Sequence, residues 1–177
     1  MKAKEFLQKN LKAIRFLAVF IALYVFLNTI YGLFVEHYYP TCDPITIIVA
    51  DEIIWLLSWF DPAVKSFSSA FNENIVIANE VDNIIYFFEG CNGVNVMIVY
   101  MCFLVAFKGP VKLLVRYSVL GLLGIHLLNL LRVSMLYGIA IHFPMQLYFF
   151  HKYLFTGILY VIVFVFWYYW VKALRHE

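Results

Sequence analysis

Apolar residues in this chain form long stretches that are separated by short polar or basic breaks. Four stretches are the longest, and they cover residues 14–35, 92–107, 111–143 and 153–171. A helix that crosses a bilayer needs roughly 20 mostly apolar residues, so the pattern predicts about four transmembrane helices. The second stretch is barely long enough to cross. The third is longer than the bilayer requires, so we expect it to tilt or protrude.

The composition is that of a membrane protein. The 177 residues are 64% hydrophobic and 20% aromatic, and only 14% are charged, which no ordinary soluble domain matches. We therefore expect one membrane-embedded domain over residues 1–177, surrounded by the lipid bilayer. The net charge is only +2 and the basic residues are scattered over several loops, so nucleic-acid binding is not expected.

Lysine and arginine residues indicate how the chain is threaded through the membrane. Ten of the 13 lie in three segments at the ends of these stretches, residues 1–15, 108–116 and 172–175. Positive residues favour the cytoplasmic side, so we predict a multi-pass protein of the inner (cytoplasmic) membrane with both termini inside. Nine of the 11 acidic residues lie in residues 36–90, which this threading places outside. The basic segment 1–15 and the long apolar run after it predict an uncleaved anchor rather than a signal peptide.

The predicted outer loop, residues 36–90, is too long to be a simple connection. Within it, residues 44–60 are mainly apolar, and the adjacent Asp51 and Glu52 near their centre make a lipid-exposed span costly. This segment is predicted to be an interfacial or re-entrant helix. Residues 74–88 contain two mainly apolar stretches with a polar centre between them, which predicts a short β-hairpin. The expected fold is an all-α, polytopic membrane helical bundle with these two additions.

Three residue types that can perform acyl transfer lie at the outer ends of three different predicted helices. Cys91 precedes the second helix, Arg132 lies far along the third, and His151 precedes the fourth. Arg132 follows Arg116 by about 16 residues, which at ~1.5 Å each places it roughly 24 Å up the helix, near the outer interface. An arginine within an apolar run is by default functional. A thiol, a base and a fixed cation are the groups that a cysteine-based acyl-transfer site requires.

Neighbouring residues add to this site, and each residue also has a structural alternative. Asn129 lies three residues before Arg132 and therefore shares its helical face. The position of Cys91 at a helix N-terminus predicts that the helix dipole favours its thiolate. The alternatives are a small buried side chain for Cys91 and an anchor at the helix end for Arg132. Composition does not single out His151 as the base, because other histidines also lie outside. These are His37 and His142.

The cysteine pattern argues against a metal site. Cys42, Cys91 and Cys102 are far apart and form no CxxC pair, which excludes the usual zinc and thioredoxin-like spacings. No metal and no cofactor is expected. Cys102 and His126 lie in the middle of predicted helices, where we expect core residues and a neutral imidazole.

Three short segments together resemble a known family. They are, in order, Glu89-Gly90-Cys91-Asn92-Gly93-Val94, Asn129-Leu130-Leu131-Arg132-Val133 and Phe150-His151. They are similar to segments of the exosortase/archaeosortase family of membrane cysteine transpeptidases, particularly the short exosortases of Gram-negative bacteria. The resemblance maps the family's cysteine, arginine and histidine onto Cys91, Arg132 and His151. The same segments contain Asn129, Asn92 and Gly93, which we expect to support the site.

This resemblance implies a membrane-embedded cysteine transpeptidase or protease with its active site on the periplasmic side. Its substrates would be secreted, membrane-anchored proteins with a C-terminal sorting tail, made of a short motif, one transmembrane helix and a basic cluster. Cys91 would attack the carbonyl beside the motif and hold the protein as a thioester. An acceptor from the cell envelope would then take the protein from the enzyme.

Two other functions remain open on the sequence. The first is a membrane thiol–disulfide exchange enzyme that uses Cys42 and Cys91, because both lie on the predicted oxidising side. The second is a non-enzymatic membrane subunit or transporter in which Arg132 and Asn129 line a polar path.

Overall fold

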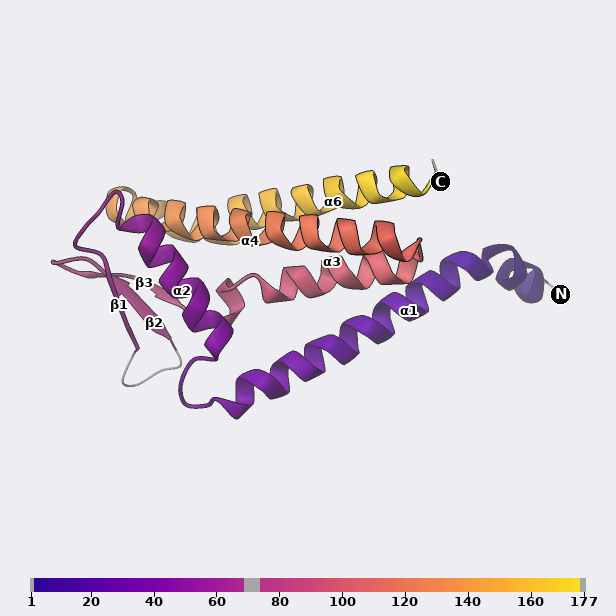
Figure 1. The fold of residues 1–177 in the computed structure, drawn as a ribbon, viewed down its shortest axis with the longest axis horizontal. Helices are drawn as coiled ribbons and strands as arrows, with labels where there is room; N and C mark the ends of the chain where they lie inside the picture. Colours follow the sequence, from indigo (N-terminus) through magenta and orange to yellow (C-terminus); the bar gives the residue numbers. More distant parts are fainter. Residues whose placement is uncertain (1, 69–73, 176–177) are drawn as a thin grey trace.

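The structure is mostly helical, with a small three-stranded sheet at one end of the molecule (Figure 1). It is a computed structural model that describes residues 2–68 and 74–175, with side chains from residue 10 onward. Met1, the side chains of the lysines before residue 10, and residues 69–73 of the predicted outer loop lie outside the described residues.

Three segments of the described chain are long and apolar enough to cross a membrane. They lie in α1 (Lys2–His37), in α4 (Val111–His142) and in the helical segment Pro144–Leu174. The helix α3 (Val94–Phe107) is apolar but has only 14 residues. At ~1.5 Å per residue it spans about 21 Å, less than the roughly 30 Å of a bilayer core. Three of the four predicted crossings are therefore long enough, and the crossing at 92–107 stays a prediction.

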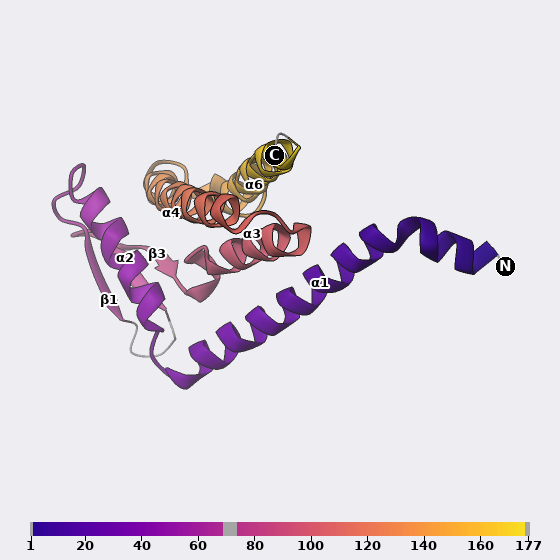
Figure 2. The ribbon, with the colours of Figure 1, turned by 45° about the vertical axis from the view of Figure 1, so that its right-hand side comes forward.

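The long helices run in alternate directions. Figures 1 and 2 show α3, α4 and α6 (Phe155–Leu174) side by side, with α1 diverging from them. Both chain ends and the basic connection between α3 and α4 lie at one end of the molecule, whereas α2 (Pro44–Leu57) and the sheet lie at the other (Figure 1). The basic segments thus gather at the end opposite to the predicted outer loop.

A compact apolar core joins α3, α4 and α6. It contains Tyr100, Leu104, Ile125, Val163 and Trp170, all of them buried. The phenol of Tyr100 donates a hydrogen bond of 2.9 Å to the Tyr117 carbonyl on α4. Gly121, on the same face of α4, allows this approach because a Cβ atom there would overlap the Tyr100 ring.

In contrast, α1 contributes little to the protein interior. None of the residues in its most apolar 18-residue window is fully buried, and only the side that faces α3 is partly covered. It meets α3 through Phe16, whose ring lies 5.5 Å from that of Phe103 and 5.4 Å from that of Phe107. Large apolar side chains exposed on this scale require an apolar surrounding, as a bilayer provides.

The segment 36–90 contains the predicted helix and the predicted hairpin. Asp43 caps the N-terminus of α2, and its carboxylate accepts hydrogen bonds from the backbone N–H groups of the first turn. The strands β2 (Ile75–Ala78) and β3 (Asn83–Phe87) pair in antiparallel fashion. A third strand, β1 (Lys65–Ser68), which the sequence pattern did not predict, pairs with the other side of β2.

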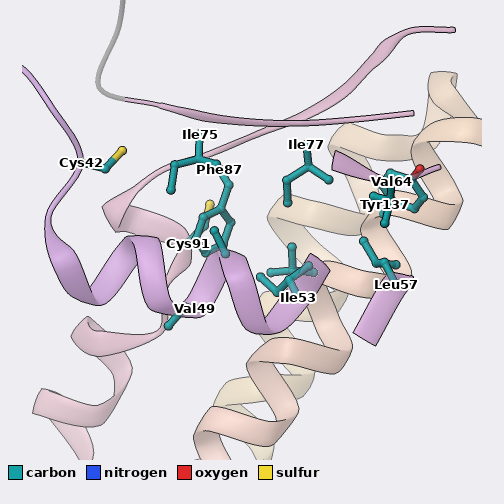
Figure 3. Close-up of a cluster of buried hydrophobic side chains, with 12 residues drawn as sticks. Cys42, Val49, Ile53, Leu57, Val64, Ile75, Ile77, Phe87, Cys91 and Tyr137 are labelled. Carbon is teal, nitrogen blue, oxygen red and sulfur yellow. The ribbon is translucent and has the colours of Figure 1, made fainter. Parts of the chain in front are cut away.

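A second apolar core lies where α2, the sheet and α4 meet (Figure 3). Val49, Ile53 and Leu57 of α2 contribute to it, and all are buried. Figure 3 shows Ile75 and Phe87 of the sheet next to Cys91, so the predicted nucleophile lies at the border of this core.

A polar contact also joins α2 to α4. His126 Nε2 lies 2.8 Å from Glu52 Oε2. The sequence pattern did not predict this contact, because it placed Glu52 in a separate loop.

Replacing Gly121 by alanine should destabilise the protein. The added methyl group would overlap the Tyr100 ring, and overpacking of this kind costs about 1–3 kcal/mol. Gly138→Ala is the matched control in the same helix, because no atom lies within 4 Å of its added Cβ. Alanine is the better helix former by up to about 1 kcal/mol, so the control should be neutral or stabilised. Differential scanning fluorimetry in detergent would measure both, and equal melting temperatures for the two variants would contradict the packing described.

Candidate functional site

Cys91, Arg132 and His151 line one cavity of about 440 Å³ at the sheet end of the bundle. They come from three separate elements: the short 3₁₀ turn η1 (Glu89–Cys91), the helix α4 and the π-helical turn η3 (Phe150–Leu154). Cys91 Sγ lies 3.8 Å from His151 Nε2. The structure thus places all three predicted site residues around the same space, with the thiol and the imidazole in contact.

The turn that carries Cys91 follows directly from β3. The Cys91 N–H donates a hydrogen bond of 2.8 Å to the Phe88 carbonyl, which closes the turn. Gly93 then begins α3 with φ of 87°, a left-handed conformation that favours glycine. A Cβ atom on Gly93 would also lie only 3.1 Å from Cγ of Asn129. Gly93 is therefore needed both for the backbone conformation and for the close approach of α4.

Asn129 connects the cysteine turn to the arginine. Its side chain is fully buried, and its Nδ2 donates a hydrogen bond of 2.8 Å to the Cys91 carbonyl. Its Oδ1 lies 3.4 Å from Nη1 of Arg132, which donates to it. A single buried amide thus fixes the backbone of the predicted nucleophile and holds one edge of the guanidinium.

Asn92 fixes the other side of the turn. Its Nδ2 donates hydrogen bonds to the Tyr31 phenol at 2.7 Å and to Thr46 Oγ1 at 2.8 Å, and its Oδ1 accepts one from the Val94 N–H at 2.9 Å. Thr46 in turn donates to the buried carboxylate of Asp43. The sequence interpretation included Asn92 but missed its partners on α1 and α2.

His151 lies in an unusual stretch of helix. The sequence predicts a helix that begins just after this residue, whereas the structure places it inside η3, which continues into α6. The Thr156 hydroxyl donates a hydrogen bond of 2.9 Å to the His151 carbonyl, five residues back. Single π-helical turns inside helices occur frequently at functional sites.

Burial sets the protonation state of Cys91. The side chain is only 7% exposed, and this desolvation raises the pKa of the thiol above its ordinary value. The charge of Arg132 and the hydrogen bond to Phe88 lower the pKa in part, without offsetting the burial. The predicted helix-dipole thiolate is therefore wrong: the resting group is a neutral thiol that needs a base.

The guanidinium of Arg132 retains capacity to bind a ligand. Its Nε is buried and has no hydrogen-bond partner among the described residues. Buried donors are nearly always paired in proteins, so an acceptor from a bound molecule would complete this site.

The remaining candidates lie elsewhere. His142 lines a different cavity, beside Gly138, and His37 ends α1. Cys102 is buried in α3, as expected for a core residue. Cys42 shares the second apolar core with Cys91, and none of the three cysteines forms a disulfide. Within the described residues, no group of three or more histidine, cysteine or acidic side chains could hold a metal ion.

A scan of protein-family models, a search of curated proteins and a search of solved structures found no match to this chain. Its function is therefore argued from the geometry, and the exosortase resemblance stays a prediction.

The rate at which iodoacetamide alkylates Cys91 should rise with pH through a midpoint above about 8.5, the pKa of an unperturbed cysteine. Arg132→Gln should raise the midpoint further, because it removes the cation that favours the thiolate. At a fixed pH near 8 the variant should react about three- to tenfold more slowly. Mass spectrometry of the Cys91 peptide would measure both rates.

Arg116→Gln, near the other end of the same helix, is the matched control and should leave the midpoint unchanged. A midpoint at or below that of a free cysteine would contradict the effect of burial.

Proposed function

We propose that this chain is a membrane-embedded cysteine transpeptidase or protease that cleaves the C-terminal sorting tail of secreted, membrane-anchored proteins. The 3.8 Å contact between Cys91 Sγ and His151 Nε2 carries the proposal. Arg132 lines the same cavity and supplies the cation that an oxyanion requires. The order of these residues along the chain, and the segments around them, resemble the exosortase family.

The first step is a proton transfer within the contact pair. His151 Nε2 takes the proton of the Cys91 thiol as the sulfur attacks the substrate carbonyl. The carbonyl oxygen becomes an oxyanion, for which Arg132 is the nearby cation. A neutral resting thiol suits this sequence, because the charge on sulfur then forms only when the base and the substrate are both in place.

The second step releases the tail and leaves the protein on the enzyme. The His151 imidazolium returns the proton to the nitrogen of the leaving peptide as the C–N bond breaks, and Cys91 retains the protein as a thioester. An amine or hydroxyl from the cell envelope then attacks the thioester, with His151 taking the proton of the nucleophile. The new bond forms, the thiol is restored, and the protein is attached to its acceptor.

The proposed setting is the inner membrane, with both termini in the cytoplasm and the cavity on the periplasmic side. The gathering of basic segments at one end of the bundle supports this orientation. An interfacial position for α2 is supported by its exposed apolar side chains, since Ile48 is 58% and Trp55 is 62% exposed. Tryptophan and other amphipathic rings favour the headgroup region.

A thiol–disulfide exchange enzyme is the second candidate, because Cys42 and Cys91 belong to the same buried core. The two functions differ in what they require of Cys42. Cys42→Ser should abolish disulfide exchange but leave tail cleavage unchanged within about twofold, since the acyl-transfer route uses one thiol.

Cys91→Ser and His151→Gln should each reduce tail cleavage by at least about 100-fold, the scale expected for loss of a nucleophile or a general base. The substrate would be a co-expressed protein from the source genome that ends in one helix and a basic cluster, and cleavage would be followed by gel mobility. His142→Gln is the matched control, because this histidine lies outside the cavity.

Each variant should be checked for insertion and melting temperature before its activity is compared. Full processing by a stable, correctly inserted Cys91→Ser protein would refute the protease proposal.

A further inference from the structure

The strand β3 lies at the edge of its sheet. The strand order is β1-β2-β3, so β3 pairs with β2 on one side and, within the described residues, with no strand on the other. A free edge presents backbone N–H and C=O groups that can pair with another extended chain.

The free edge of β3 borders the cavity. Five consecutive residues, from Ile84 to Phe88, line it. Successive side chains of a strand point to opposite faces, so a space that touches only one face of the sheet would be lined by every second residue. Contact with all four of the strand residues among them, Ile84 to Phe87, indicates that the cavity runs along the edge itself.

The opposite wall of the cavity is apolar. Val133 and Leu136 of α4 form part of it, and Pro144 and Leu147 continue it. Of the described residues that line the cavity, none is acidic, and Arg132 is the only lysine or arginine. The space of about 440 Å³ lies within the range of specific ligand sites, roughly 300–1,000 Å³. It therefore suits a short extended segment with uncharged side chains.

The chain path connects this edge to the thiol. Phe88 ends the run that lines the cavity, and its carbonyl accepts the hydrogen bond from the Cys91 N–H. A peptide lying along β3 would therefore pass the Cys91 sulfur with its backbone, which is the part of the substrate that the thiol must reach.

We propose that the polypeptide substrate binds as an added strand on the free edge of β3, which guides its scissile carbonyl to Cys91. The recognised element is an extended, uncharged segment, held mainly by its main chain. This inference deepens the proposed function and rests on it only for the identity of the occupant as substrate. An acyl chain would also fill the apolar space, but it would leave the backbone groups of the edge unpaired.

Binding can be tested without catalysis in the full-length Cys91→Ser protein. The probe is a fluorescein-labelled hexapeptide of alternating valine and threonine, and its affinity is measured by fluorescence anisotropy in detergent. A series of peptides carries one N-methyl group each, at successive positions. Methylation of the N–H groups that face β3 should weaken binding about tenfold, and methylation of those between them should change it less than twofold.

A loss of affinity at every second methylated position distinguishes the addition of a strand from nonspecific apolar binding. N-methylation makes a peptide more apolar, so partition into detergent or into a lipid-binding groove would leave affinity unchanged or increase it. Equal effects at all positions, or unchanged binding throughout the series, would overturn the proposal.

Two substitutions on the protein side locate the binding site. Leu147→Trp narrows the cavity and should weaken binding of the unmethylated peptide at least about fivefold, whereas Phe149→Trp, an exposed residue outside the lining, should not. The binding assay does not depend on catalysis. If every second N-methyl group weakens binding but the native protein does not cleave the tail, only the transpeptidase proposal is refuted. Cleavage without that periodicity would refute strand addition alone.

Discussion

The hydrogen bond from Asn129 to the Cys91 carbonyl fixes the turn on which the site is built. Both groups are buried between α3 and α4, where an unpaired carbonyl or amide costs about 1–3 kcal/mol. Asn92 adds a second restraint toward α1 and α2. Two adjacent residues of the turn are thus held by buried amide hydrogen bonds from opposite sides. Both sets of bonds therefore act on the backbone that carries the sulfur in contact with His151.

Much of the fold could be predicted because it follows from length and apolar content. The helices α1, α4 and α6 are long runs with few charged residues, and such runs have few alternatives to a helix. The hairpin of β2 and β3 was predictable from local alternation around a polar turn. The shared depth of Cys91, Arg132 and His151 followed from the constant rise of a helix together with the positions of the basic turns.

Other features could not be predicted, because they depend on partners far apart in the sequence. The amide of Asn92 finds Tyr31 and Thr46 only after α1 and α2 have packed, and the sequence separations are 61 and 46 residues. The pairing of His126 with Glu52 depends in the same way on the docking of α2 against α4. The protonation state of Cys91 was predicted wrongly because local position suggested a thiolate, whereas the degree of burial, a tertiary property, decides it.

The π-helical turn at His151 has a consequence for the helix that follows it. Such a turn accommodates one residue more than an α-helical turn, and one residue corresponds to about 100° of rotation. The face that α6 presents to α3 and α4 is therefore out of phase with the face predicted by a helical wheel drawn from Leu147. Insertion or deletion of one residue within this turn would rotate α6 relative to the histidine. The packing face of α6 and the direction of the His151 side chain can therefore change independently.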